Sequence, residues 1–136
     1  TPRSNRRQRQ MCIRDSGYPL KNTRIAVFGV AYKRNVDDPR ESPFFPLREL
    51  LQKKGALLNV YDSWVTTENT TASVAQCLDQ VRAVVLVTEH TDILEQLREI
   101  DFAGLGIEVV VDGRNCLDGD ALRIQGILYR GIGRRP

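Results

Sequence analysis

Short apolar runs alternate with amphipathic stretches along most of this chain. Five runs rich in valine, isoleucine and leucine predict β-strands at residues 24–29, 57–62, 83–89, 107–114 and 126–133. Apolar positions at helical spacing between them predict helices at 44–55, 71–80 and 92–100, and a short helix or turn at 116–126. We therefore expect an α/β fold: a Rossmann-like, doubly wound, mostly parallel sheet of about five strands with helices on both faces.

The third strand and the first helix carry the clearest patterns. Residues 83–89, AVVLVTE, are nearly all apolar or β-branched, which is typical of a parallel strand covered on both faces. In residues 44–55, FFPLRELLQKKG, apolar side chains share one helical face, and the final glycine supplies a left-handed end. Ser42 and Pro43 suit the N-cap and first position of this helix, whereas Pro46 would suit a later start.

The positive charge lies mainly at the N-terminus. The whole chain has a net charge of +3, but residues 1–16 contain five arginines and one aspartate, which leaves about −1 for the remainder. Residues 1–16 have no periodicity, and MCIRDS at 11–16 resembles a translated sequencing-adapter string. We expect a disordered or non-native arm at 1–16 and one domain at 17–136. That domain has no basic excess, so no nucleic-acid partner is predicted.

Neither a membrane span nor a metal site is indicated. No apolar run reaches transmembrane length, and the N-terminus lacks the apolar core of a secretion signal. Cys12, Cys77 and Cys116 lie far apart and His90 is the only histidine, so no zinc-ligand spacing exists. Isolated thiols fit a reducing compartment, and we expect a cytoplasmic protein.

Ligands of doubly wound sheets bind beyond the carboxyl ends of the strands, near the point where strand order reverses. These ends are predicted at 29–33, 62–64, 88–90, 112–115 and 131–133. Lys33, Arg40 and Arg114 lie at or near them, and we expect these cations to converge on an anion together with backbone N–H groups at a helix start. A phosphate or pyrophosphate fits such a set.

Acidic residues are interleaved with these cations. We expect Asp37, Asp38 and Glu41 to hold the cations by ion pairing, which is simpler than Mg²⁺ binding by the two aspartates. Gly29 stands alone at the end of the first strand, so the GxGxxG fingerprint of dinucleotide-binding folds is absent.

Three segments carry a resemblance to a known family: IAVFGVAYKRNVDDPRESP at 25–43, VLVTEH at 85–90 and VVDGRNCLDG at 110–119. They resemble the C-terminal domain of the UDP-glucose/GDP-mannose dehydrogenase family, whose pattern is G-[LVF]-[AS]-[FY]-K-x-x-[TV]-x-D-x-R-E-S, then V-x-T-[ED]-[HW], then D-x-R. The resemblance covers about residues 20–133. The first segment looks closest to the UDP-N-acetylhexosamine 6-dehydrogenase branch, which favours UDP over GDP.

The resemblance implies an activity for the full-length protein. Family members oxidise C6 of a nucleotide-bound sugar from alcohol to carboxylate with two NAD⁺ in succession. By the match, Tyr32 and Lys33 line the substrate, with Lys33 on the diphosphate, and Arg114 contacts the substrate across the cleft. Arg40 reaches toward the cofactor on the facing domain.

The same resemblance implies roles for the acidic loop residues and for the rest of the enzyme. Asp38 and Glu41 orient the loop. NAD is bound mainly by an N-terminal domain, and the nucleophilic cysteine lies in a glycine-rich motif of a central segment that dimerises. None of the three cysteines has that context, so we expect a UDP-sugar-binding lobe that is inactive alone. Its partners are the N-terminal and central domains, in an enzyme that is homo-oligomeric at full length.

Two other functions share some of these features. A stand-alone nucleotide-binding module would use the same residues without further domains. A phosphoacceptor receiver domain is also doubly wound, and Asp37, Asp38 and Thr88 imitate its acids and threonine. A receiver, however, needs an aspartate where Thr88-Glu89-His90 ends the third strand, and a lysine after the fifth strand that is missing here.

Three remaining residues invite chemical roles that we do not favour. His90 beside Glu89 suggests acid–base chemistry, but we expect a structural role. Trp64 could stack on a uracil base, but we expect it to pack in the core or between domains. Cys116 lies nearest the predicted cleft, and a nucleophile there would need a lowered pKa, so we expect an ordinary thiol.

Overall fold

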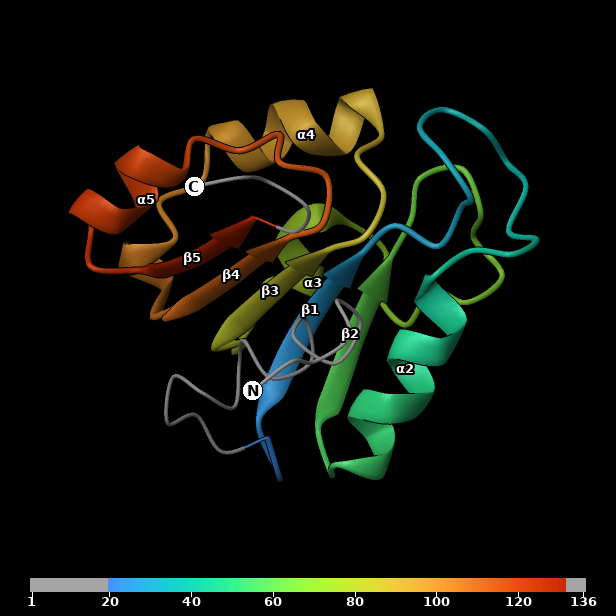
Figure 1. The fold of residues 1–136 in the computed structure, drawn as a ribbon, viewed down its shortest axis with the longest axis horizontal. Coiled ribbons are helices and arrows are strands. Elements are labelled where there is room, and N and C mark those ends of the chain that lie inside the picture. The colour runs from blue at the N-terminus through green and yellow to red at the C-terminus, as the bar shows by residue number, and fades with distance from the viewer. Residues whose placement is uncertain (1–19, 132–136) are drawn as a thin grey trace, which may run out of the picture.

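A computed structural model describes residues 20–131, which form one parallel sheet (Figure 1). Its strands run in the order β2-β1-β3-β4-β5, and every neighbouring pair is parallel. The bounds are β1 (Arg24–Phe28), β2 (Leu57–Tyr61), β3 (Ala83–Leu86), β4 (Val109–Asp112) and β5 (Leu128–Gly131). The order reverses between β1 and β3, which confirms the predicted Rossmann-like, doubly wound class.

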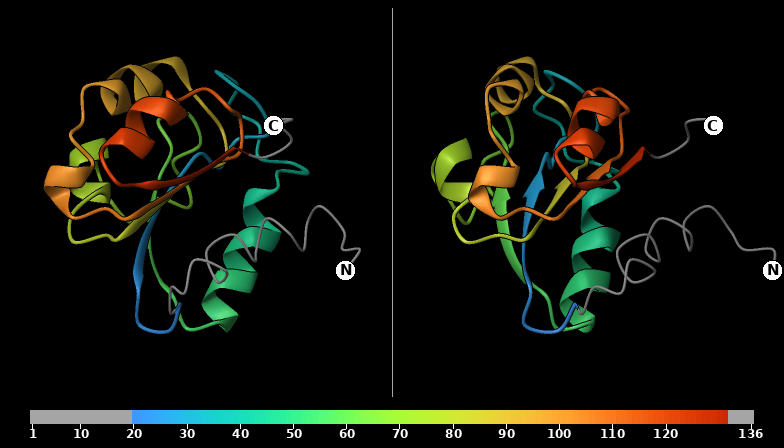
Figure 2. Two further views of the ribbon diagram at one scale, coloured as in Figure 1. Left: turned by 60° about the vertical axis from the view of Figure 1, so that its left-hand side comes forward. Right: turned by 90° about the vertical axis from the view of Figure 1, so that its left-hand side faces the viewer.

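Helices cover both faces of the sheet, as predicted. The helical elements are α2 (Phe44–Lys53), α3 (Val74–Cys77), α4 (Thr91–Arg98), the 3₁₀ helix η1 (Ala103–Leu105) and α5 (Gly119–Ile124). α2 packs on one face, while α3, α4 and α5 pack on the other. In the right-hand view of Figure 2, β1 and β2 separate α2 from α3. This division is the expected result of right-handed crossovers on either side of the reversal point.

Alternation along the strands produces two hydrophobic cores. Ala26 and Phe28 of β1 join the core under α3, α4 and α5, while Ile25 and Val27 join the core under α2. Successive side chains of a strand point to opposite faces, so a strand buried on both sides must be apolar throughout. The continuous apolar pattern of β3 has the same cause, because all four of its residues are buried.

Loop contacts shorten several predicted elements. The helix predicted at 71–80 is shortened to α3 (Val74–Cys77), because Thr70 and Thr71 bond to the backbone of Val60 in β2. The helix predicted at 116–126 begins at Gly119, since the N–H groups of Cys116 and Leu117 bond to Asp112. Two further predictions, the arm at 1–16 and the last residues of the strand at 126–133, lie outside the described residues.

The start of α2 settles the alternative left by Pro46. The helix begins at Phe44, whose N–H bonds to Ser42 Oγ at 3.2 Å. Pro46 lies in the first turn, where a helix does not use the backbone N–H group, so the proline is tolerated. Ser42 therefore caps the helix one residue earlier than a standard N-cap, and Pro43 takes the N-cap position.

We expect Gly29→Ala to destabilise the protein by about 3 kcal/mol. Gly29 has φ +101°, and a Cβ there would lie 2.4 Å from the backbone nitrogen of Thr88. Gly106→Ala is the matched control, because Gly106 has φ +81° with nothing within 4 Å of an added Cβ. It should cost only the left-handed strain, about 1 kcal/mol. Urea unfolding measures both, and equal losses would show that the contact with Thr88 is unimportant.

Candidate functional site

The loop from Gly29 to Pro43, here the β1–α2 loop, leaves the sheet where the strand order reverses (Figure 1). Its first backbone groups are all held. Gly29 N–H bonds to Tyr61 O at 3.1 Å. The N–H groups of Val30 and Ala31 both bond to Asp62 Oδ2, at 2.6 and 2.9 Å. A loop with its backbone fixed in this way presents its side chains in a defined arrangement.

Further bonds fix the rest of this loop. The carbonyl of Ala31 accepts from Thr88 Oγ1 at 2.6 Å and from Ser42 Oγ at 3.4 Å. Tyr32 N–H bonds to Asp38 O at 2.7 Å and closes the loop on itself. Thr88 and Ser42 belong to the family-like motifs, and their hydroxyl groups are buried structural donors.

Asp62 is a fully buried carboxylate at the carboxyl end of β2. Besides the two loop bonds, its Oδ1 accepts from the N–H groups of Trp64 and Val65 at 2.6 and 2.8 Å. His90 Nε2 lies 2.9 Å from Oδ1 and 3.0 Å from Oδ2. Burial acts to raise the pKa of Asp62, but the bonds from His90 and the backbone outweigh it and lower the pKa from 3.8 to about 2.

This carboxylate corrects one expectation about the site. In a dinucleotide-binding turn, the N–H groups after the first strand cradle a pyrophosphate. Here those of Val30 and Ala31 bind Asp62 instead. The start of α2 offers little more, because Pro43 and Pro46 have no N–H and that of Phe44 bonds to Ser42. The N–H groups of Val30, Ala31 and Phe44 are therefore not available to a phosphate.

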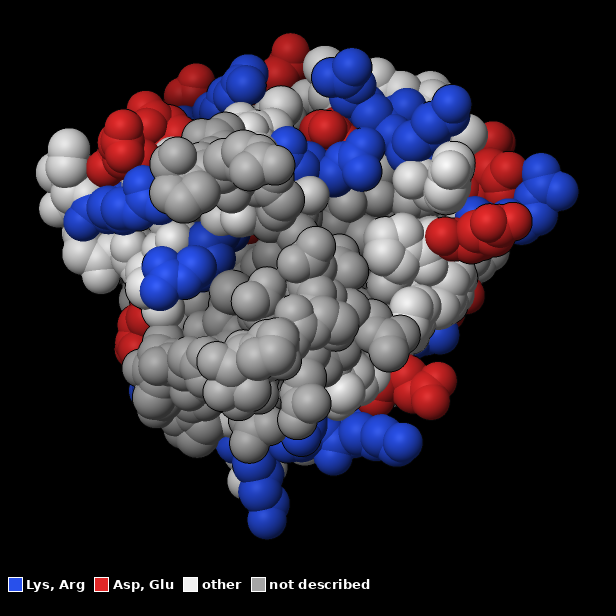
Figure 3. Space-filling model, in the orientation of Figure 1, with Lys and Arg blue, Asp and Glu red and all other residues white. Residues whose placement is uncertain are grey.

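The side chains at the tip of the loop are exposed. Tyr32 is 50% exposed, and Lys33 and Arg34 also face solvent. Figure 3 shows Lys and Arg side chains gathered along the upper edge of this view, above the carboxyl ends of the strands, with Asp and Glu side chains among them. The predicted substrate residues Tyr32 and Lys33 thus combine a held backbone with accessible side chains.

Only one of the expected ion pairs forms within this loop. Asp38 accepts from Arg40 Nε at 3.0 Å and from Nη2 at 2.8 Å. The bond from the Arg40 side chain, with one from its backbone, lowers the pKa of Asp38 to about 2. Asp37 and Glu41 form no ion pair with residues 20–131, and Glu41 instead occupies a left-handed turn at φ 59°. Among the described acidic residues, Asp38 is thus the one that orients Arg40.

Arg114 lies on the loop after β4. Its backbone N–H bonds to the buried carboxylate of Asp112 at 3.0 Å, and its Nε pairs with Glu89 Oε1 at 3.2 Å. The partner of Arg114 is therefore Glu89 and none of the acids of the β1–α2 loop. Gly113 N–H bonds to Leu86 O at 2.9 Å, which brings this loop against the end of β3.

The segment Thr88-Glu89-His90 joins the two loops. Thr88 and His90 bond to the β1–α2 loop, while Glu89 holds Arg114. Tyr32 and Lys33 therefore lie on a loop held by Thr88 and His90, and Arg114 lies on a loop held by Glu89. Asp38 and Arg40 form a separate, exposed pair in the same loop as Lys33.

Residues 26–119 match the UDP binding domain of the UDP-glucose/GDP-mannose dehydrogenase family. This chain belongs to that family. Its relatives include the UDP-N-acetyl-D-mannosamine dehydrogenase of Pyrococcus horikoshii, 30% identical over 110 residues that cover 81% of this chain and 25% of the relative. Another is the UDP-glucose 6-dehydrogenase of Rhizobium meliloti, 30% identical over 136 residues, 90% of this chain and 30% of the relative.

Solved structures agree with this membership. The UDP-D-ManNAc dehydrogenase of Pyrococcus horikoshii superposes with a TM-score of 0.75 at 25% identity, covering 96% of this chain and 30% of that one. The UDP-glucose dehydrogenase of Pyrobaculum islandicum gives 0.70 at 26% identity, with 96% and 30% covered. The resemblance to the UDP-N-acetylhexosamine dehydrogenase branch is confirmed. The chain spans 25 to 30% of the length of the relatives named here.

Family membership removes the receiver-domain alternative. The strand order β2-β1-β3-β4-β5 is also that of receivers, so the fold alone does not separate the two. Chemistry does, because a receiver needs an aspartate at the end of β3, where this chain has buried Thr88, whose hydroxyl donates to Ala31 O, and then Glu89, which is paired with Arg114.

Neither described cysteine has the properties of a nucleophile. Burial raises the pKa of Cys77 to about 12. Burial, followed by the nearby charges of Asp112 and Glu89, raises the pKa of Cys116 to about 12. Both thiols are protonated at neutral pH, as an ordinary thiol role requires. Cys12 lies outside the described residues.

His90 and Trp64 are neighbours in space, in the loops that follow β3 and β2. His90 is fully buried with both ring nitrogens bonded, in line with a structural role. Trp64 is 47% exposed, which excludes the core position and leaves packing between domains as the prediction for it. Its ring lies over His90, with centroids 6.0 Å apart and planes at 29°.

Sequence reasoning missed several residues that build this site. Asp62 and Asp112 each follow an apolar strand, and that position was the available signal for a buried carboxylate at a strand end. Asn35, which bonds to His90 and Thr91, gave no such signal. Within residues 20–131 no cluster of three or more His, Cys, Asp or Glu could hold a metal ion. No helix in the same range has the length and hydropathy to cross a bilayer.

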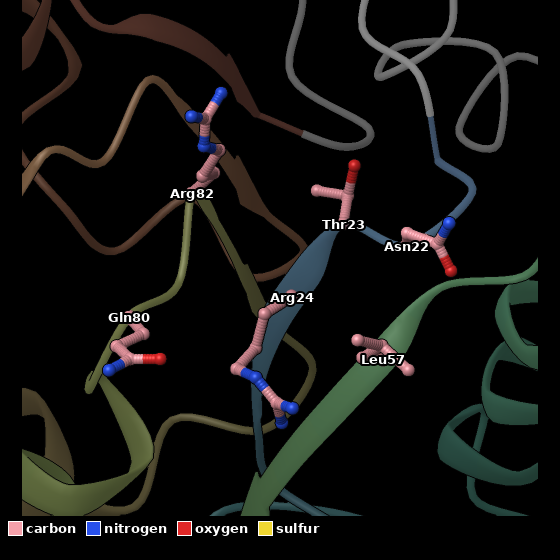
Figure 4. A pocket seen from close by; sticks show the side chains of 6 residues that line it. All are labelled: Asn22, Thr23, Arg24, Leu57, Gln80 and Arg82. Carbon is pink, nitrogen blue, oxygen red and sulfur yellow. The ribbon is translucent and has the colours of Figure 1, made fainter.

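A pocket of about 450 Å³ lies at the opposite end of the sheet (Figure 4). Its lining comes from the turn before β1, the first residues of β1 and β2, and the turn before β3: Asn22, Thr23, Arg24, Leu57, Gln80 and Arg82. Arg24 is engaged with Asn59 at 2.8 Å and Arg82 with Glu108 at 3.8 Å. Because ligands of doubly wound sheets bind at the carboxyl ends of the strands, this pocket is not the candidate site.

Proposed function

We propose that this chain is the UDP-sugar-binding lobe of an NAD-dependent nucleotide-sugar 6-dehydrogenase, which oxidises the C6 alcohol of the sugar to a carboxylate. One observation carries the proposal. The segment Thr88-Glu89-His90 holds the exposed Lys33 loop on one side and Arg114 on the other, within the part of the chain that matches the family's UDP binding domain. UDP-glucose and UDP-N-acetyl-D-mannosamine, named for the relatives, define the substrate class.

Side chains account for the recognition of the diphosphate in this proposal. The Lys33 ammonium meets the diphosphate as a point charge, and the Tyr32 ring lines the nucleotide. Arg114 approaches from the second loop; its bond to Glu89 uses Nε, and we assign its terminal nitrogens to contact the ligand. Because the Val30 and Ala31 amides are engaged with Asp62, exposed charges dominate, and binding should weaken with salt.

The described residues do not fit an NAD site. The GxGxxG fingerprint is absent from the sequence, and the amides that would cradle a pyrophosphate bind Asp62. We therefore assign NAD mainly to an N-terminal domain beyond this chain. Arg40, 86% exposed at its side chain and aligned by Asp38, is the residue here that extends toward that domain.

The same proposal covers catalysis and assembly. With the pKa of Cys77 and Cys116 raised to about 12, the nucleophilic cysteine belongs to a central segment outside this chain. The chain by itself is then an inactive lobe that works with the N-terminal and central domains in a cytoplasmic homo-oligomer. A stand-alone nucleotide-binding module would bind the same ligand, and the genomic reading frame before Gly17 distinguishes the two.

Calorimetry with UDP, GDP and inorganic phosphate tests this function. We expect UDP to bind in the millimolar range, more tightly than phosphate, because one lobe supplies only half of the contacts. NAD⁺ reduction with UDP-glucose should be absent. No heat with any of the three ligands at millimolar concentration would contradict the binding site. Turnover that Cys116→Ser abolishes would contradict the assignment of catalysis to other segments.

A further inference from the structure

We propose that His90, with Asp62 behind it and Asn35 in front, positions the loop that presents Tyr32 and Lys33. His90 Nδ1 accepts from the backbone N–H of Asn35 at 2.8 Å, while Nε2 faces the Asp62 carboxylate at 2.9 Å. The inference rests on the function proposed above for Tyr32 and Lys33. It makes His90 a positioning residue, since the ring reaches the ligand only through the loop.

The hydrogen bonds assign the tautomer of His90. An N–H group donates to Nδ1, so Nδ1 carries no proton. Nε2 then carries the proton and donates it to the carboxylate of Asp62. Both side chains are fully buried, and the Trp64 ring lies over the imidazole. The neutral ring is thus a fixed connector between a buried anion and the loop backbone.

The loop is pinned on both sides of Lys33. Before it, Ala31 is held by Asp62 and Thr88. After it, Asn35 is held through its N–H by His90, and its side chain exchanges two bonds with Thr91, at 2.9 and 3.1 Å. Asn35 has φ 56°, so the chain turns sharply at this pin. Fixing the backbone in advance reduces the ordering cost of binding, which favours affinity.

A direct chemical role for His90 is excluded by its surroundings. A general acid or base must come within hydrogen-bond reach of the substrate. Both ring nitrogens are already bonded within the protein, and the side chain has no exposed surface. Its influence on the ligand therefore passes through Asn35 and the backbone that carries Lys33.

Three variants of the 136-residue chain test the positioning role, with UDP as the probe. His90→Phe removes both bonds, and His90→Gln keeps an acceptor for Asn35 and a donor for Asp62. Asn35→Gly removes only the two bonds to Thr91 and suits the left-handed φ. Asn22→Gly is the matched control, because Asn22 is also exposed and left-handed, at φ 62°, but lies at the opposite end of the sheet.

We expect His90→Phe to weaken UDP binding about tenfold, which is the range for lost hydrogen bonds. His90→Gln should restore most of the affinity. Asn35→Gly should weaken binding about threefold with an unchanged melting temperature, and Asn22→Gly should bind like the wild type. Nitrogen-15 spectra should show Nδ1 of His90 unprotonated. Hydrogen exchange at the Asn35 amide should accelerate in His90→Phe and recover in His90→Gln.

The outcomes separate this inference from the proposed function. If the wild type binds UDP but folded His90→Phe and Asn35→Gly bind equally well, the positioning role is wrong and the UDP site stands. If the wild type does not bind UDP, the proposed function fails. In that case hydrogen exchange at the Asn35 amide still tests the contact between His90 and the loop. An exchange rate that is unchanged in His90→Phe would overturn the positioning role. If His90→Phe does not fold, the nitrogen-15 spectrum of the wild type decides, because a protonated Nδ1 could not accept from the Asn35 N–H and would overturn the inference.

Discussion

Lys33→Ala is expected to weaken UDP binding by roughly 1.5–3 kcal/mol, which is the range for a hydrogen bond to a charged group. The melting temperature should stay nearly unchanged. Lys33 faces solvent, forms no ion pair with residues 20–131 and contributes nothing to either core. Its loss therefore removes a cation from the ligand without removing packing, because exposed charges contribute little to stability. Calorimetry and thermal unfolding on the same variant measure the two effects.

Arg34→Ala is the matched control for this prediction. Arg34 is the next residue, is equally exposed and carries the same charge. A general attraction between the loop and the diphosphate would make the two variants equivalent, whereas a specific contact confines the loss to Lys33. Well-folded Lys33→Ala with wild-type affinity for UDP would remove the central residue of the proposed site. A parallel loss of stability would instead assign Lys33 a structural role.

Asp62→Asn is expected to lower the free energy of unfolding by about 3–5 kcal/mol. The carboxylate is fully buried and accepts from four backbone N–H groups and from His90. An asparagine amide would turn two hydrogens toward these donors and leave several buried groups without a partner. Because three strand ends meet at this residue, the loss should appear in global unfolding by urea.

The acid dependence of stability supplies a second measure of Asp62. Its pKa is lowered from 3.8 to about 2, so the contribution is fully present above about pH 4 and is lost as the pH falls toward 2. Asp62→Asn should remove that part of the pH dependence. Asp38→Asn is the control, because Asp38 has a pKa of about 2 as well but lies in an exposed pair. Equal losses in the two variants would contradict the importance of burial.

Local patterns in the sequence were sufficient for the fold. For residues 20–131, alternating apolar runs and helical stretches predicted the five strands, three of the α-helices and a short helix or turn at the place of α5, because strands need their faces covered and parallel strands need crossovers. The carboxyl ends of the strands, and with them the place of Lys33 and Arg114, followed from the same pattern. The predicted ends of helices and strands were less accurate where a side chain bonds to distant backbone, as Thr70 does to Val60 in β2.

The arrangement of the site was decided by tertiary structure. Asp62 bonds to Val30 across 32 residues and to His90 across 28, and Arg114 finds Glu89 across 25. Such partners are set by strand order and register, which bring the ends of β2, β1, β3 and β4 side by side. The sequence places Arg114 far from its side-chain partner Glu89, and the sheet brings Glu89 within reach of it. For this reason the sequence pattern was enough to predict which end of the sheet carries the candidate site, and only the packed sheet determined how the loops at that end are held.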